Sequence, residues 1–253
     1  LIPVLALRLS EPALLVDLRR IPGLADIAVS ADRVRLGASV RWCDIEAESR
    51  VRAAHPLLAE AVDHVAHVQI RNRGTVGGSI AHADPAAELP AIAVTCDATV
   101  RIAGARGERT VPAAEFFVGP LMTVLEPDEI VVELAFPRWP AERRWAFCEF
   151  ARQRGGFALA GIALHFDEED GRAVDAHIGV LGASSRLHRI TEAETVLNDA
   201  KIDETVIERA ADAAMAAVDP IDEVETSADY RRALVGTLLK RALRSAMTRG
   251  HGP

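Results

Sequence analysis

The apolar and polar positions of this chain alternate in patterns that predict short helices and strands in turn. Val34, Leu36 and Ala38 fall on every second position, which is the pattern of a half-buried strand. The remaining elements expected in the first half are a short helix over 14–24, a helix over 55–68, a strand over 98–104, a helical stretch over 112–119 and a strand over 129–137. This mixture indicates the α+β class.

The C-terminal part has a different rhythm, with strands first and helices after. Strands are expected over 157–166 and 173–184, joined by a turn at Asp170-Gly171, a pair that favours hairpin turns. Three helices are expected to follow. One covers 203–218 with Asp203 as its cap, because the apolar positions there recur at spacings of three and four. These positions are Val206, Ile207, Ala210, Ala211, Ala214 and Met215.

The last helix is expected over 228–247. Its apolar positions predict one buried face, and its arginines and lysine are interpreted as a solvated face, with a partner interface as the alternative. The buried positions expected are Leu234, Leu238, Leu239 and Ala242. Between the two parts, Pro137 and Pro140 enclose the segment PRWP, which is the best candidate for a domain boundary because proline favours extended backbone.

Composition narrows the functional classes. The chain has 253 residues, 49% of them hydrophobic, which is enough for a sizeable core and two domains. Its formal net charge of -8, without a basic stripe, argues against nucleic acid as a partner. The apolar runs are too short to cross a bilayer, so no membrane insertion is expected. Three widely spaced cysteines indicate reduced thiols and a cytoplasmic location.

The stretch RNRGTVGGSIAHADPAAELP at 71–90 is rich in glycine and invites two interpretations. It is either a tight connection or a concave set of backbone N–H groups that holds a phosphate, with Thr75 and Ser79 adding hydroxyl donors. The residues alone leave both open. Other chemistries have no support, because the chain lacks the GxSxG, GxxxxGK[ST] and GxGxxG motifs.

Three segments together resemble a known family. QIRNRGTVGGSIAHADPAAELP, with LIPVLALRLSEPALLVDLRRIPGL before it and GPLMTVLEPDEIV after it, is similar to the FAD-binding medium subunit of molybdenum hydroxylases. This family includes the carbon monoxide dehydrogenase medium chain and the xanthine dehydrogenase FAD domain. The resemblance covers essentially the whole chain.

The resemblance implies a fold and its domains. A PCMH-type FAD-binding domain is expected over 1–138, made of two α+β subdomains at about 1–50 and 51–138, the first incomplete. A C-terminal domain of the carbon monoxide dehydrogenase flavoprotein type is expected over 141–253, with a three-stranded antiparallel sheet and three helices.

The resemblance also implies the residues that bind FAD. The family motif T-x-G-G-[NS] falls on 75–79, and an acidic residue that binds flavin hydroxyls falls on Glu88. Two further positions are expected to lie near the flavin rings, the apolar Val131 and the polar Glu149. The complete set is Thr75, Val76, Gly77, Gly78, Ser79, Glu88, Val131 and Glu149. No catalytic acid, nucleophile or metal ligand is expected on this chain.

In such a family the chain is the FAD-carrying electron-transfer subunit. The resemblance implies a large partner with molybdopterin and a small partner with [2Fe-2S] clusters, assembled as a dimer of heterotrimers, and electrons that pass from the clusters through FAD to an external acceptor. The alternatives are a scaffold subunit without a cofactor and a stand-alone flavin oxidase. Two departures favour the scaffold if the start at Leu1 is natural. The family's AGGxS motif, expected just ahead of Leu1, is not in the chain, and Gly156 stands where an acidic residue is usual.

Several other residues have simple interpretations. His82 beside Asp84 is expected to order the loop rather than relay protons. His64 and His67 have a spacing compatible with metal ligation but no third ligand. The remaining residues singled out are Arg71 and Arg73, which suit a phosphate, a carboxylate or a partner equally, and Trp42 and Trp145, which suit packing.

Overall fold

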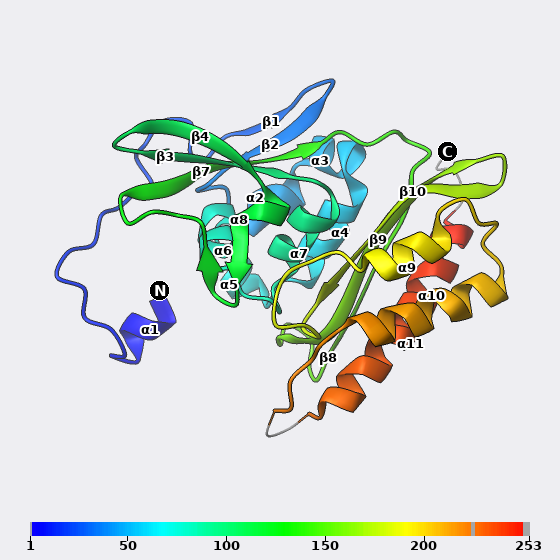
Figure 1. The fold of residues 1–253 in the computed structure, drawn as a ribbon. Coiled ribbons are helices and arrows are strands. Elements are labelled where there is room, and N and C mark those ends of the chain that lie inside the picture. The colour runs from blue at the N-terminus through cyan, green and yellow to red at the C-terminus, as the bar shows by residue number, and fades with distance from the viewer. Residues whose placement is uncertain (1, 224–225, 250–253) are drawn as a thin grey trace.

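A computed structural model, which describes residues 2–223 and 226–249, shows four layers (Figure 1). A five-stranded sheet covers a layer of helices, and a three-stranded sheet lies on the other side of those helices. The last three helices cover the outer face of the three-stranded sheet. The α+β class and the C-terminal plan of three antiparallel strands with three helices are therefore confirmed.

The five-stranded sheet is antiparallel throughout and draws strands from both ends of the first half of the chain. Its order is β1 (Ile27–Val29), β2 (Arg33–Gly37), β7 (Glu129–Pro137), β3 (Thr99–Gly104) and β4 (Gly107–Pro112). β2 pairs with β7, so one sheet runs through both of the expected subdomains. The side chains of Val34, Leu36 and Leu134 are fully buried beneath it, as their alternation predicts.

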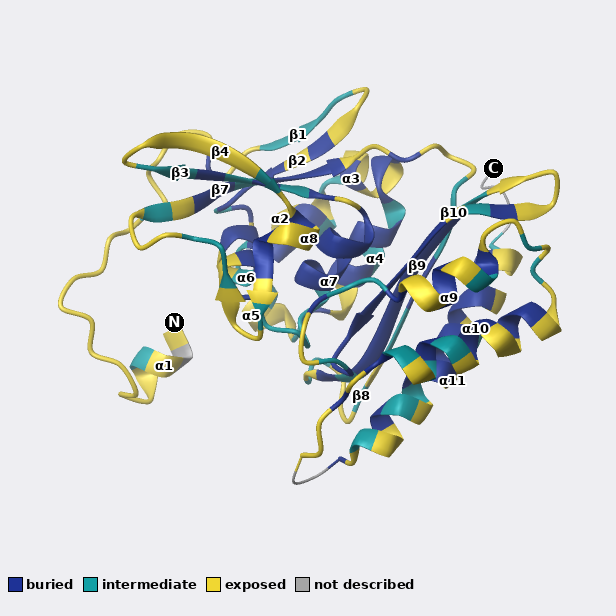
Figure 2. Cartoon of the chain, in the orientation of Figure 1, coloured by how far each residue is buried: buried dark blue, intermediate teal, exposed yellow. Residues whose placement is uncertain are grey.

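The helical layer consists of short helices. They are α2 (Trp42–Ala47), α3 (Ser49–Ala54), α4 (Pro56–His64), α5 (Val68–Arg71), α6 (Val76–His82), α7 (Glu88–Thr95) and α8 (Ala113–Phe116). α1 (Ile2–Ala6) stands apart on the exposed N-terminal segment, and β5 (Phe117–Gly119) with β6 (Met122–Thr123) forms a small hairpin. In α7, every residue from Leu89 to Thr95 is buried (Figure 2).

The C-terminal unit is built from long strands and an outer row of helices. The elements are β8 (Arg144–Ala151), β9 (Ala158–Glu169), β10 (Arg172–Leu181), α9 (Thr191–Leu197), α10 (Glu204–Ala217) and α11 (Ala228–Thr248). The turn at Asp170-Gly171 is confirmed, because both residues have positive φ angles between paired strands. Asp203 caps α10 by accepting a hydrogen bond from Val206 N at 2.9 Å.

Alternate residues of the C-terminal sheet face opposite layers. One set packs under α9–α11, and the other, which we call the inner face, points at the FAD-domain helices. Pairing of the strands arranges the inner face in three rows: Trp145, His165 and His177; Phe147, Ala163 and Gly179; Glu149, Gly161 and Leu181. Because the small residues leave room in the middle, α7 lies directly against β9 and β10.

The prediction of a helix over 14–24 is wrong. The segment has no regular helix, and Leu14, Leu15 and Val16 are exposed. Asp17 accepts a hydrogen bond from the Arg19 backbone N–H at 2.9 Å, which satisfies that donor locally instead of through a helix. A short amphipathic segment needs a surface to pack on, and only its last part reaches the core.

Two other helices are shorter than expected. The helix over 55–68 breaks at Ala66, which has a φ of 41°, and resumes as α5. The stretch over 112–119 is helical only through Phe116, and its second half is strand β5. In both cases tertiary pairing overrides a weak local preference.

One basic residue of the last helix is not on its solvated face. Arg231 is buried, and its guanidinium donates to the carbonyl of Gly182 and to the Glu223 carboxylate. The prediction that all arginines of α11 point outward is wrong at this position. On the other face, Leu238, Leu239 and Ala242 are buried as expected, whereas Leu234 is only half-buried.

No helix among the described residues is long and apolar enough to cross a membrane. The segment PRWP is packed rather than loose. Trp139 is buried and stacks on His55 and His165, with ring centroids 4.1 and 4.7 Å apart, so the connection between the two sheets is itself part of the core.

Candidate functional site

The motif TVGGS forms the beginning of α6. Thr75 is extended and is the N-cap, and its hydroxyl oxygen accepts a hydrogen bond from Gly78 N at 3.2 Å. Val76 and Gly77 are buried, whereas Gly78 is exposed and Ser79 is half-buried. The sequence folds this way because a β-region threonine followed by small residues provides both a cap and room for close packing.

Four of the five backbone amides of the motif are engaged within the protein. The donor-acceptor distances are 2.9 Å from Val76 N to Val40 O, 2.8 Å from Gly77 N to Ala38 O, and 3.0 Å from Ser79 N to Thr75 O. Gly78 N is bonded to the Thr75 hydroxyl oxygen. The amides of residues 76–79 therefore do not form the free concave set of N–H groups that was expected.

The two glycines of the motif have different surroundings. A Cβ on Gly77 would lie 2.6 Å from the Cβ of Ala38 and 2.9 Å from its carbonyl oxygen, so this glycine permits backbone packing inside the domain. A Cβ on Gly78 would meet only the Thr75 hydroxyl, at 2.9 Å. Gly78 thus presents bare backbone outward, and Gly77 does not.

Glu88 lies in the first turn of α7, at the end of the loop that follows α6. Its carboxylate stands at the positive end of the helix dipole and accepts a hydrogen bond from its own backbone N–H. Burial nevertheless raises the pKa of Glu88 to about 7, with nearby Asp84 adding to the effect. The loop is held in shape by Asp84, whose carboxylate accepts a hydrogen bond from Ala86 N at 2.9 Å.

Glu149 lies on β8, on the inner face of the C-terminal sheet. Its Oε2 atom is buried and has no hydrogen-bond partner among the described residues. Burial, and after it the negative charge of Glu88, raises the pKa of Glu149 to about 8. Two expected FAD residues from different domains therefore interact electrostatically, and one of them has an unsatisfied oxygen.

Val131 is located differently from the other expected site residues. It lies on β7, is 5% exposed and belongs to the core of the first domain. At this point β7 bulges against β3, so that Val131 and Val132 are both buried instead of alternating. The structure brings together Glu88 and Glu149, and it places Val131 inside the core.

The other residues considered from the sequence have structural roles. Arg71 lies 2.9 Å from the Glu46 carboxylate and donates to the carbonyls of Val65 and Ala66. His64 packs against the ring of Phe147, with centroids 4.9 Å apart. Among residues 2–223 and 226–249, no group of three or more side chains has the arrangement of a metal site.

The tip of the β8–β9 hairpin closes on the first domain. Gly155, with a φ of +76°, lies so close to His67 that a Cβ would be 2.7 Å from its ring. The next residue, Gly156, lines a surface hollow of 790 Å³ together with Phe157, which is 76% exposed. The position where the family usually has an acidic residue is therefore at the surface.

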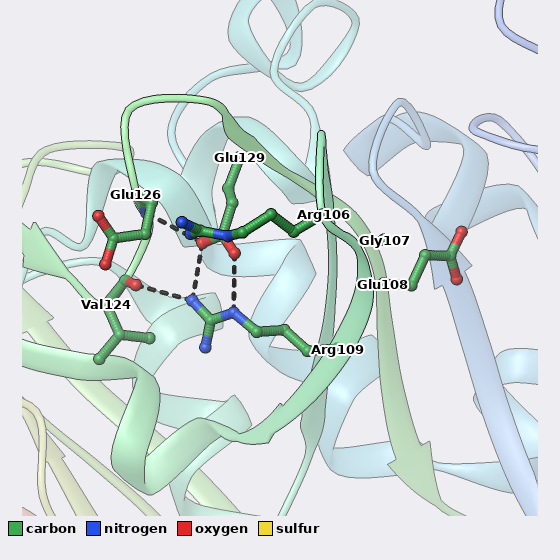
Figure 3. Close-up of a pocket in the computed structure, with 7 residues that line it drawn as sticks. All are labelled: Arg106, Gly107, Glu108, Arg109, Val124, Glu126 and Glu129. Atoms are coloured by element: carbon green, nitrogen blue, oxygen red, sulfur yellow. Dashed lines mark hydrogen bonds and ion pairs between the residues drawn. The ribbon is translucent and has the colours of Figure 1, made fainter.

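A second surface hollow, of 410 Å³, lies between the β3–β4 hairpin and the loop before β7 (Figure 3). Arg109 donates to both carboxylate oxygens of Glu129, at 2.9 and 2.7 Å, and to the carbonyl of Val124. These bonds attach the loop to the hairpin. None of the expected FAD residues lines this hollow, and it is a charged surface feature.

Two buried histidine rings behind the candidate site, those of His165 and His177, were not expected from the sequence. His165 and His177 are 2% and 5% exposed, and their ring centroids lie 4.5 Å apart on the inner face. The signal was available, because the segments G-I-A-L-H and H-I-G-V-L-G alternate small or polar residues with large apolar ones. The polar members of such an alternation face the partner layer.

The family models cover nearly the whole chain. Residues 1–139 match the FAD binding domain in molybdopterin dehydrogenase, and residues 145–246 match the CO dehydrogenase flavoprotein C-terminal domain. The nicotine 6-hydroxylase medium subunit of Paenarthrobacter nicotinovorans is 38% identical over 98% of this chain and 87% of its own length. A 6-hydroxypseudooxynicotine dehydrogenase complex subunit alpha from the same organism is 40% identical, covering 98% and 84%.

A solved structure shows the same fold. Carbon monoxide dehydrogenase from Hydrogenophaga pseudoflava superimposes with a TM-score of 0.94 at 37% identity, over 98% of this chain and 86% of that chain. The resemblance drawn from the sequence is confirmed, as are the FAD-binding domain and the assignment as an oxidoreductase subunit. The chain belongs to the family of FAD-binding medium subunits of the molybdenum hydroxylases.

Proposed function

We propose that this chain carries FAD between its two domains and passes electrons from a partner's [2Fe-2S] clusters to an external acceptor. The large partner would hold molybdopterin, and the complex would be a cytoplasmic dimer of heterotrimers. Relatives named as medium or alpha subunits of hydroxylase and dehydrogenase complexes support the assembly. The cysteines Cys43, Cys96 and Cys148 are free, which agrees with a reducing compartment.

The observation that supports this most directly is the unsatisfied Oε2 of Glu149. A buried polar atom without a partner costs about 1–3 kcal/mol, and a ligand that supplies the partner recovers that free energy. The ring nitrogens, carbonyls and hydroxyls of FAD can supply one. The residues present therefore fit the cofactor at this point, even though the amides of residues 76–79 are engaged elsewhere.

The chain's own contribution is to bind and orient the cofactor. With its pKa raised to about 8, Glu149 is mostly protonated at neutral pH when no ligand is present, and Glu88, with a pKa of about 7, is protonated about half of the time. A protonated carboxyl can both donate and accept, so the pair can match donors and acceptors on a flavin without a net charge. FAD, when bound, supplies the capacity to take up and release electrons.

The remaining expected contacts are assigned by exposure. Gly78 and Ser79 are accessible on α6 and are proposed to contact the diphosphate side of the cofactor. Thr75, Val76 and Gly77 are proposed to shape that surface, since their polar groups are already engaged. Val131 is proposed to support it from the core. We keep the domain limits of 1–138 and 141–253 as part of this proposal.

The test is FAD binding by the full-length protein in its complex. We expect the purified complex to show flavin absorbance, and the flavin-depleted protein to rebind FAD in a fluorescence titration. Glu149→Ala and Glu88→Ala, which remove the carboxyl, should each weaken the affinity about tenfold, as expected for the loss of a hydrogen bond to an ionisable group. A complex without flavin that does not rebind FAD would support the scaffold alternative instead.

A further inference from the structure

The helix that begins with Glu88 ends in a contact with two histidines of the other domain. The carbonyl oxygen of Thr95 accepts hydrogen bonds from His165 Nε2 at 3.2 Å and from His177 Nδ1 at 2.9 Å. Thr95 is fully buried, and its hydroxyl already donates to Ala91 O at 2.7 Å. The last carbonyl of α7, which has no acceptor role inside the helix, is thus satisfied by the C-terminal sheet.

Both nitrogens of the His177 ring face oxygen atoms. Its Nδ1 faces the Thr95 carbonyl and, at 3.3 Å, the Asp97 carboxylate, while Nε2 lies 3.1 Å from Asp175 Oδ1. The Thr95 carbonyl can only accept, so Nδ1 donates the hydrogen of the bond to α7.

The carboxylates around His177 are themselves paired with arginines. Asp97 also meets Arg189 at 3.3 Å, and Asp175 lies 3.7 Å from Arg143. The neighbouring His165 ring is neutral, because burial and the adjacent His177 hold its pKa well below the usual range. The Cys96 thiol beside Asp97 is buried, with a raised pKa. His177 is therefore the ring that links the end of α7 to Asp97 and Asp175.

Glycines allow α7 to pack closely against the C-terminal sheet. A Cβ on Gly179 would lie 1.7 Å from the Thr95 hydroxyl oxygen, so only glycine permits this approach. Near the other end of the helix, Gly182 N donates to Pro85 O at 3.0 Å, just ahead of Glu88. The C-terminal sheet consequently holds α7 and its leading loop at both ends.

The dimensions of the two elements match. From Glu88 to Thr95 the helix rises about 10.5 Å. Along the inner face, the row of Glu149 is four residues from the row of His165, or about 13 Å. A helix of this length, fixed to the histidine row by its last carbonyl, places its first turn near Glu149.

We propose that His177, supported by His165, is a positioning residue for the FAD site: its hydrogen bond to the end of α7 sets Glu88 at the other end opposite Glu149. This rests on the proposed function, because it assumes that Glu88 and Glu149 contact FAD. His177 touches no cofactor in this scheme. It acts on Glu88 through α7, which spans the distance between the His165 row and the Glu149 row of the inner face.

The test uses two replacements of His177 in the full-length protein within its complex. An asparagine amide can replace Nδ1, so His177→Asn retains the bond to Thr95. A glutamine amide replaces Nε2, so His177→Gln retains only the bond to Asp175. We expect His177→Gln to raise the Kd for FAD about tenfold and His177→Asn to raise it less than about threefold, although both remove the imidazole ring. His188→Gln, on the same domain, is the control.

Hydrogen exchange of the α7 amides supplies a readout that does not involve FAD. It should rise in His177→Gln and stay near wild type in His177→Asn. Equal losses of affinity in both variants, in step with their melting temperatures, would overturn the positioning role, as would faster exchange in α7 with unchanged affinity. A wild-type protein that binds no FAD, or Glu88→Ala and Glu149→Ala variants with wild-type affinity, would instead contradict the proposed function.

Discussion

The two ends of α7 differ in how the polar groups around them are hydrogen-bonded. At its carbonyl end, Thr95 is buried and accepts two hydrogen bonds from His165 and His177. At its amino end, Glu88 faces a partly buried carboxyl, Glu149, whose Oε2 has no partner among the described residues. His165 Nδ1 also lacks a partner among the described residues, but His165 is buried, whereas Glu149 is half-buried. The unsatisfied atom that a ligand can reach is therefore at the amino end.

The titratable groups near the two ends of α7 also make the free energy of unfolding respond to pH in opposite directions. Burial lowers the pKa values of His55 and His165, which lie on the carbonyl side of α7, so these two rings are neutral and acid must force protons onto them. The carboxyls at the ligand end hold protons to about pH 7 and 8, so alkali must remove them. The free energy of unfolding should therefore pass through a maximum between these two limits.

The largest expected effect is the loss of stability in acid. Burial lowers the pKa of His55 from 6.5 to about 3, so the unfolded chain binds a proton that the folded protein does not. Stability from this group is full above pH 6.5 and falls toward pH 3, by about 3 kcal/mol at pH 4. Urea unfolding at a series of pH values measures it.

The matched variant for this prediction is His55→Asn. Its amide oxygen can accept the hydrogen bond from Leu58 N that His55 Nδ1 accepts at 3.3 Å, and it cannot take up the proton. The acid slope of this variant should be flatter than that of the wild type, whatever its stability at pH 7. The same slope in both proteins would show that His55 is not the group responsible.

The next effect concerns the close approach of β10 to the carbonyl end of α7, at Gly179 and Thr95. Gly179→Ala places a methyl group against the Thr95 hydroxyl and should reduce the free energy of unfolding by about 1–3 kcal/mol. Gly119→Ala, where a Cβ would only meet Met122 at ordinary contact distances of 3.5 and 3.8 Å, is the control. Thermal melts compare the two. Similar small losses in both would mean that α7 can move away from β10 without cost.

Near the amino end of α7, replacing Glu149 should increase the stability of the flavin-free protein. Because the pKa of Glu149 is raised from 4.5 to about 8, its stabilising contribution is full below pH 4.5 and lost as pH rises through 8. Glu149→Gln should thus stabilise the flavin-free protein by about 1–2 kcal/mol at pH 8.5, a value discounted for partial exposure, with no gain at pH 4. Exposed Glu142→Gln is the control for denaturant unfolding at both pH values. A gain of equal size at pH 4 would contradict the ionisation account.

The smallest effect on stability is expected at the exposed glycine of the motif. Gly78→Ala should change the free energy of unfolding by less than about 0.5 kcal/mol, since its methyl meets only a rotatable hydroxyl. Its FAD affinity should nevertheless fall several-fold. Gly77→Ala, which meets Ala38 backbone, should instead lose stability. Melting curves and FAD titrations on both variants separate the two roles, and the reverse pattern would refute this division of the motif.

The sequence predicted much of the fold because many elements carry their own local signals. The Asp170-Gly171 turn, the Asp203 cap and the apolar face of α10 except for half-buried Met215 were correct, since each depends on residues within one turn or one hairpin. The helix expected over 14–24 failed for the converse reason. Its apolar residues had a helical spacing but no surface to pack on, which no local pattern can reveal.

For the candidate site, the sequence alone determined the family, the expected FAD residues and the positions that place Glu88 at the start of a helix. Only the tertiary structure showed that the amides of residues 76–79 are occupied, that Val131 lies in the core, and that Glu88 and Glu149 from separate domains share one electrostatic environment. The physical reason is that burial and pairing of charges depend on which distant segments meet. His177 and Thr95, 82 residues apart, meet only because β10 packs against α7.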